Sequence, residues 1–180
     1  MSTPIGHSLA GISIYFLSGS RFSSPGWKVL FLCVVVACLP DVDFLPGFFA
    51  GNINCFHHKG THSLFFALVV SSGVWFALRK SNGIKWGFLA FMLILSHLVI
   101  DYVAIDRTAP FGMPLLWPFS GEYFYFKYAF LPEVLRESSV ASIFNRHNLR
   151  TVIVELAIFL PIALLCYRCG RRLVSEEMMS

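Results

Sequence analysis

The stretch IKWGFLAFMLILSHLVIDYVA, residues 84–104, decides the fold of this chain. Its unbroken apolar core is somewhat shorter than the roughly 20 residues that cross a membrane unaided, and polar or aromatic residues extend it. His97 and Asp101 stand near its end, four residues apart, so on a helix both side chains project from one face. Taken alone, this pair is explained at least as well by a hydrogen bond inside a helical bundle as by a metal site.

The composition of the whole chain indicates an integral membrane protein. Of its 180 residues, 56% are hydrophobic and 13% are charged, and the mean hydropathy is +0.67. An average soluble domain is roughly one quarter charged. The length favours one domain, residues 1–180. No cluster of Lys and Arg with aromatic or polar readers is present, which argues against nucleic-acid binding.

Five apolar stretches predict an all-α, multi-pass transmembrane bundle of about five short helices. The runs are solidly apolar rather than alternating, which disfavours barrel strands. The predicted spans are roughly 5–20, 28–46, 62–79, 84–104 and 150–168. Residues 105–149 form a long connection, whose amphipathic part around Leu131–Leu149 predicts an interfacial helix.

The basic residues predict the orientation in an inner (cytoplasmic) membrane. Short loops and the C-terminal tail hold one group of them, which the positive-inside rule places in the cytoplasm. This group is Arg21, Lys28, Arg79, Lys80, Lys85, Arg168, Arg171 and Arg172. The C-terminus is then cytoplasmic, and the opposite ends of the helices face outward, toward the periplasm in a bacterium.

Two further ionisable groups lie at the ends predicted to face outward. In LPDVD, residues 39–43, Pro40 disfavours the helical conformation of Leu39 and so ends the second helix. Asp41 and Asp43 then fall in an irregular segment where their carboxylates can converge, although a turn or cap would account for Asp41 alone.

The segment FHHKGTHS, residues 56–63, places three imidazoles within six residues, and Thr61 or Ser63 can cap the following helix. His7 opens the first apolar stretch at the same predicted membrane face. A single histidine there is as readily an interfacial residue as a ligand.

Together these residues supply more donors than one metal ion needs. Mixed nitrogen and oxygen donors without thiolate favour Zn²⁺, as one or two ions, with Mn²⁺ or Fe²⁺ as the alternatives. The candidate metal ligands are His7, Asp41, Asp43, His58, His62, His97 and Asp101.

The order of these motifs resembles a known family. TPIGH (3–7), LPDVD (39–43), THS (61–63), SHLVID (96–101) and PLLWPF (114–119) are similar to the YdjM-like inner-membrane proteins, which are described as metal-dependent hydrolases. Some relatives are described as LexA-controlled and SOS-induced. The resemblance covers about residues 1–120 and matches His7, Asp41, Asp43, His62, His97 and Asp101. A fainter similarity links the ligand order to zinc-dependent phospholipase C and P1-type nucleases.

One departure from the family pattern leaves a ligand open. The family commonly reads H-R-G-x-T-H-S, whereas here His58-Lys59-Gly60 runs directly into Thr61-His62. The match to H-basic-G favours His58, and the distance along the chain to His62 favours His57.

The function that we expect is metal-dependent hydrolysis of a phosphoester or lipid-type substrate. A metal activates water, Asp43 or Asp101 acts as general base, and Lys59 steadies the developing charge. The predicted partners are the lipid bilayer and such a substrate. The alternative is a non-catalytic metal-binding membrane protein: a sensor, an assembly factor or a transporter, although ligands gathered at one end disfavour transport.

Overall fold

The computed structural model describes residues 1–18, 26–51, 56–107, 111–135 and 144–179. These residues form six α-helices and two short 3₁₀ helices, with no β-strand among them. The elements are α1 (Pro4–Ser18), α2 (Trp27–Ala37), η2 (Leu39–Asp43), α3 (Phe44–Phe49), η3 (Gly60–His62), α4 (Leu64–Ala77), α5 (Gly83–Tyr102) and α6 (Arg146–Met179). The predicted all-α fold is confirmed.

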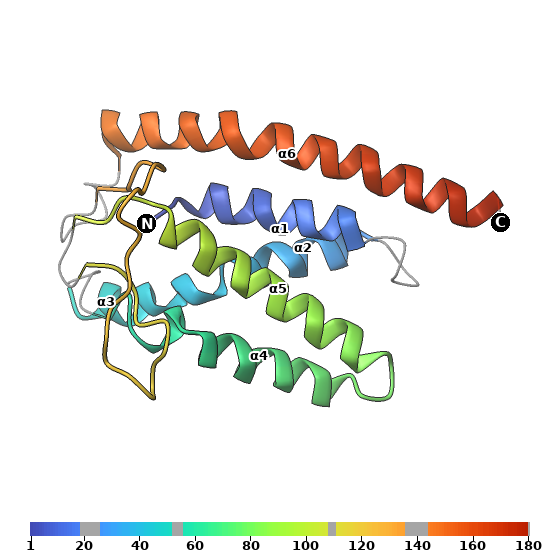
Figure 1. Cartoon of the computed structure of the whole chain (residues 1–180), viewed down its shortest axis with the longest axis horizontal. Helices are drawn as coiled ribbons and strands as arrows, with labels where there is room; N and C mark the ends of the chain where they lie inside the picture. The colour runs from blue at the N-terminus through green and yellow to red at the C-terminus, as the bar shows by residue number, and fades with distance from the viewer. Residues whose placement is uncertain (19–25, 52–55, 108–110, 136–143, 180) are drawn as a thin grey trace.

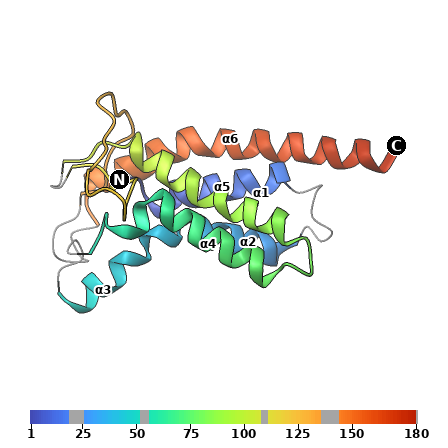
Figure 2. The ribbon, with the colours of Figure 1, turned by 60° about the horizontal axis from the view of Figure 1, so that its bottom comes forward.

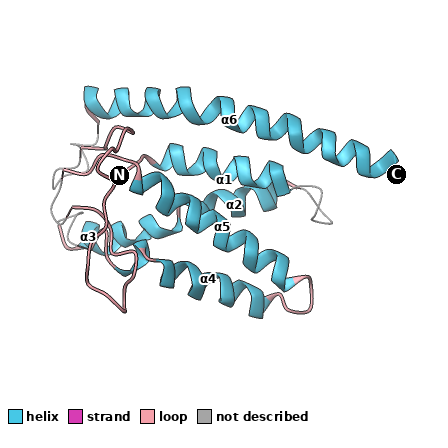
Figure 3. Ribbon diagram, in the orientation of Figure 1, coloured by secondary structure: helices cyan, strands magenta, loops and turns pink. Residues whose placement is uncertain are grey.

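The five longer helices run along the long axis of the molecule, and α6 lies along one edge against α1 (Figure 1). The same arrangement is visible after a turn of 60° (Figure 2). Connecting loops gather at one end of the bundle, together with α3 and the N-terminus (Figure 3). The turn between α4 and α5 and the C-terminus lie at the other end (Figure 1).

Within the described ranges, two helices are long and apolar enough to cross a membrane, α5 and the part of α6 from Arg146 to Leu173. The count becomes three if α2 and the segment Leu39–Phe49, which are bent by 57°, form one broken span. The sequence predicted five spans. Fewer meet the length that crossing needs, because α1 has 15 residues and α4 has 14.

The core between α1, α2 and α5 is apolar. Cys33 and Ala37 of α2 pack with Leu89 and Leu93 of α5 in a buried cluster. On the other side of α5, Gly87 allows α4 to approach closely: a Cβ at this position would lie 2.9 Å from the Ser71 carbonyl oxygen. This packing fixes the direction of α5 and therefore the place of the side chains on its last turn.

Local sequence accounts for the breaks at the loop end. As predicted, α2 ends before Pro40. The segment with Asp41 and Asp43 was predicted to be irregular, and it instead forms a 3₁₀ helix. Ser63 caps α4 by accepting a hydrogen bond from the Phe66 N–H, which satisfies one donor of the first turn.

The long connection differs from its prediction where the structure describes it. Residues 131–135 are not helical, and Leu131 instead forms a parallel bridge with Ala104. Residues 136–143 of the predicted interfacial helix lie outside the described residues. Residues 144–145 are not helical, and residues 146–149 form the first turn of α6.

Candidate metal centre

The ionisable side chains predicted to share one membrane face do lie together at the loop end of the bundle. His7 is on the first turns of α1, Asp41 and Asp43 are in η2, His62 ends η3, and Asp101 lies in the last turn of α5. Because α1, α2, α4 and α5 alternate in direction, these positions meet at one end (Figure 1).

Four of these side chains form the centre of the cluster: Asp41, His62, His97 and Asp101. One donor atom from each lies within 4.8 Å of the others. The Nε2 atoms of His62 and His97 are 3.3 Å apart, and Asp101 Oδ2 lies 3.5 Å from the first and 3.2 Å from the second. Asp41 Oδ1 lies 3.6 Å from the His62 Nε2 and 3.7 Å from the His97 Nε2.

These spacings suit donors around a single metal ion. Metal–donor bonds of about 2.0–2.1 Å place tetrahedral ligands about 3.3 Å apart. Neither buried carboxylate oxygen of Asp41, nor Oδ2 of Asp101, accepts a hydrogen bond from a described residue. Buried carboxylate oxygens are normally paired, so these atoms fit a role as metal ligands. The cluster can hold a metal ion.

The surrounding residues orient both central imidazoles. The Nδ1 of His97 is 2.8 Å from the Ala37 carbonyl oxygen, which can only accept a hydrogen bond, so Nδ1 carries the proton and Nε2 is left as the donor atom for a metal. The Nδ1 of His62 lies 3.2 Å from Asp43 Oδ2, which selects the same tautomer. The broken end of α2 thus supplies both a ligand segment and the carbonyl that orients His97.

His7 packs against this centre from α1. Its ring stacks on that of His97 with centroids 3.7 Å apart, and its Nε2 lies 3.4 Å from Asp101 Oδ1. The side chain is completely buried. The first helix therefore contributes an imidazole beside Asp101. The donor groups found among the described residues do not include His7, and its role as a metal ligand stays a prediction.

A second set of donors continues the cluster on the loop side. Nδ1 of His57 is 2.8 Å from Asp43 Oδ1, and His57, His58 and His62 offer ring nitrogens within 4.8 Å of one another. Both imidazoles that the sequence left as alternatives thus face the cluster. His58 has a left-handed backbone conformation with φ of 53°, which is uncommon for a residue with a side chain and often marks functional sites.

The charge of His62 is governed by the carboxylates around it. Burial lowers the pKa of this imidazole, but the facing carboxylates, Asp101 first and then Asp41 and Asp43, outweigh burial, so that the pKa lies well above its usual value. A metal that binds at His62 therefore competes with a proton.

The N-terminal residues connect α6 to the cluster. Ser2 donates its backbone N–H to Asp101 Oδ1 at 2.9 Å, and its hydroxyl donates to Glu155 Oε1 at 2.8 Å. Thr3 donates its backbone N–H to Glu155 Oε1 at 2.8 Å and its hydroxyl to Oε2. Glu155, completely buried on α6, therefore holds the segment that orients Asp101.

Two residues near the cluster were missed from the sequence. Asp106 lies with Oδ2 3.7 Å from the His58 Nδ1, and it follows α5 in a loop without periodicity that could have marked it. The role of Ser2 depends on a contact with Asp101 across 99 residues, for which the sequence offers no signal.

Lys59 lies at the edge of the cluster. Its side chain is exposed, and its ammonium is 5.1 Å from the centre of the Phe56 ring. The groove that it lines also reaches Asp43 and Thr61. Its part in catalysis stays a prediction.

Fold and cluster together define a helical membrane protein with a buried His/Asp centre that can hold a metal ion. A family model described as YdjM inner membrane protein matches residues 1–174, and the chain belongs to that family. The resemblance found in the motifs is thus confirmed and extends well beyond residue 120. No curated protein and no solved structure matches the chain, so the fainter similarity to phospholipase C and P1-type nucleases gains no support.

Proposed function

We propose that this chain is a membrane-bound metal-dependent hydrolase that acts on a phosphoester or lipid-type substrate. The observation that carries the proposal is the set of four convergent donors on Asp41, His62, His97 and Asp101, with spacings that suit one ion. A cluster of this kind at the end of membrane helices is costly without a bound cation, because the carboxylates are buried together.

Zinc fits the donor set best, with Mn²⁺ or Fe²⁺ as alternatives. Two imidazoles and two carboxylates form the central group, and the donor groups found among the described residues include no cysteine. The imidazole of His57, which shares a donor group with Asp41 and Asp43, gives a second ion a place beside the first. A bound Zn²⁺ supplies Lewis acidity, which makes water a nucleophile near neutral pH.

The remaining roles in hydrolysis, orienting the imidazoles and accepting a proton from water, belong to side chains of the protein. With a single ion at the central group, Asp43 orients the imidazoles of His57 and His62, because it is engaged by both of them and by the Thr61 hydroxyl. Of the two aspartates predicted as general base, Asp101 can serve only when it is not a metal ligand, because Oδ2, its oxygen without a hydrogen bond from a described residue, is the atom that the central donor group uses. In the hydrolysis, the water oxygen bonds to phosphorus, the P–O bond to the alcohol breaks, and the alcohol leaves with a proton.

The proposed membrane orientation puts the cluster at the outer face and the C-terminus in the cytoplasm. Lys80, Lys85 and Arg172 stand at or near the α4–α5 turn and the C-terminal part of α6, the end of the bundle opposite the cluster (Figure 1). The positive-inside rule assigns such an end to the cytoplasm. Cysteine labelling from outside should spare position 82 and modify position 122. The reverse labelling pattern would place the cluster in the cytoplasm.

A non-catalytic metal-binding role is the second candidate. His7, His62 and His97 are completely buried, and closed sites are typical of structural metals rather than catalytic ones. Against this, a cavity reaches Asp101 and His58 from one side, which gives a substrate an approach to the cluster.

Metal analysis followed by a substrate screen separates the two candidates. The purified protein should contain at least one equivalent of a divalent metal, and should release alcohol or phosphate from phosphoester or lipid substrates only when metal is present. Bound metal with no turnover on any of these substrates would favour the non-catalytic role, and a protein that binds no metal would contradict both.

A further inference from the structure

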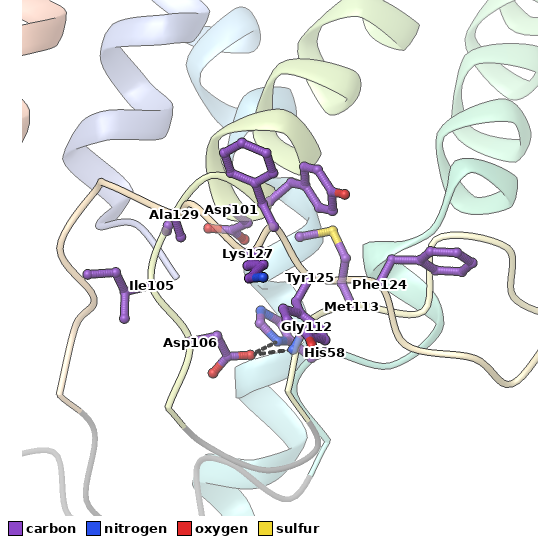
Figure 4. A pocket seen from close by; sticks show the side chains of 13 residues that line it. His58, Asp101, Ile105, Asp106, Gly112, Met113, Phe124, Tyr125, Lys127 and Ala129 are labelled. Atoms are coloured by element: carbon purple, nitrogen blue, oxygen red, sulfur yellow. Dashed lines mark hydrogen bonds and ion pairs between the residues drawn. The ribbon is translucent and has the colours of Figure 1, made fainter.

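A cavity of about 240 Å³ opens beside the cluster, between the end of α5 and the loops that follow it (Figure 4). His58, Asp101 and Asp106 form its polar side. Met113 and Phe124, from the aromatic connection, contribute apolar surface. The cavity therefore joins the edge of the metal cluster to a surface that can accept an organic group.

A positively charged side chain lines this cavity. Lys127 is the only Lys or Arg side chain among its described lining residues. Its ammonium lies 5.9 Å from the centre of the Tyr128 ring, and it forms no ion pair with a described residue. Lys59, by contrast, lines the separate groove that reaches Asp43.

Of the other polar groups in the cavity, Asp106 is already engaged. Asp106 accepts the Gly112 N–H at 2.7 Å and lies 3.7 Å from His58. A ligand entering here meets the ammonium of Lys127, a metal at the Asp101 side, and apolar surface elsewhere. Two positive centres separated by apolar walls are complementary to an anionic group that carries an organic substituent.

We infer that this cavity is the substrate subsite and that Lys127 binds the phosphate group of a phosphoester, whose organic part lies against Met113 and Phe124. The inference rests on the proposed hydrolase and names the residue that recognises its substrate. Lys127 is exposed on a loop, so its replacement leaves the packed helices intact. The organic part can belong to a membrane lipid or to a water-soluble ester, since both carry the same phosphate chemistry.

The test measures binding of inorganic phosphate to the metal-loaded protein in detergent, with metal content determined for each sample. Lys127→Ala should weaken phosphate binding about tenfold to 100-fold, because it removes a charge-assisted hydrogen bond, while metal content stays unchanged. Lys127→Arg should retain most of the binding. Lys85→Ala, at the other end of the bundle, is the matched control and should bind as the unaltered protein does.

Unchanged phosphate affinity in Lys127→Ala, or a loss that Lys59→Ala causes instead, would overturn the inference. The proposed hydrolase activity can fail separately from the subsite. In that case the protein turns over no substrate, but Lys127→Ala still weakens phosphate binding. Competition with phosphatidic acid in micelles and with glycerol phosphate identifies the source of the phosphate. Tighter binding of the micelles points to a lipid, and equal binding points to the soluble ester, and either result supports the subsite.

Discussion

The two halves of α5 are held by different interactions. In the first half, Leu89 and Leu93 lie in the apolar cluster with α2, and Gly87 lets α4 approach closely. In the second half, His97 and Asp101 face other ionisable groups, and one Asp101 oxygen accepts no hydrogen bond from a described residue. One continuous helix thus joins a well-packed end to an end with incomplete polar pairing.

The difference shows how the fold supports a costly site. Apolar packing contributes stability wherever side chains fit, whereas buried carboxylates destabilise a protein unless a cation or hydrogen bonds compensate them. The packed half fixes the helix, and the charged half is held as well by Ile100, which packs with Ala104 and Leu131. A metal that binds only the folded state then adds stability through its affinity.

The largest expected effect comes from removing a central imidazole. His97→Ala should lower metal affinity by more than about 100-fold, since loss of a ligand exceeds the tenfold to 100-fold cost of losing its outer partners. Metal titration of the purified protein measures this. Ser96→Ala, on the same helix with its hydroxyl bonded to the Leu93 carbonyl, is the control and should retain the metal. Equal metal content in His97→Ala would exclude His97 as a ligand.

A smaller effect is expected from the support behind Asp101. Glu155→Gln loses acceptor capacity toward Ser2 and Thr3, so the segment that donates to Asp101 should be held less firmly. Metal affinity should fall by about tenfold, the lower end of the cost of losing a supporting residue. Glu122→Gln, an exposed change, should leave it unaltered. If Glu155→Gln reduced thermal stability but not metal affinity, α6 would only stabilise the bundle.

A change in the packed half should affect stability and spare the metal. Gly87→Val places a side chain against Ser71 and Trp75, and overpacking of this kind costs about 1–3 kcal/mol. At Gly73 a Cβ meets nothing within 4 Å, so Gly73→Val should change stability much less. Thermal unfolding compares the two, and metal affinity of the folded Gly87→Val protein should match the original. A parallel loss of metal affinity would show that the halves of α5 are coupled.

The last prediction concerns the dependence of metal affinity on pH. The pKa of His62 is raised, so below that pKa the imidazole holds a proton that a metal must displace. Affinity should therefore increase with pH, by at most about tenfold per pH unit for one proton, and level off once His62 is deprotonated. Metal titrations at several pH values measure the slope. An affinity that falls as pH rises through this range would contradict the assignment of His62 as a ligand.

Much of the cluster could be predicted because it follows local rules. His97 and Asp101 share a face through helical periodicity, and Pro40 ends α2 through its effect on Leu39. Because the apolar helices alternate in direction, the end of α5 with His97 and Asp101 and the end of α2 then meet at the same end of the bundle as His62. These inferences need no knowledge of distant contacts.

The remainder depends on contacts between distant parts of the chain. Glu155 and Ser2 are 153 residues apart, and no local pattern links them. Asp106 and Lys127 lie in loops, where neither periodicity nor a cap restricts their side chains. The predicted last span, residues 150–168, is also shorter than α6, because the helix begins earlier, at Arg146, and continues through the arginines beyond residue 168.

The close contact between Gly60 and Trp117 gives the protein an optical reporter of its histidine segment. A Cβ added at Gly60 would lie 2.9 Å from the indole ring, so the ring rests directly on the backbone between His58 and His62. Indole fluorescence responds to its surroundings, and any movement of this backbone alters them. A Trp117→Phe protein would show which part of the emission comes from this contact, and the difference spectrum would follow metal binding in detergent solution without an added dye.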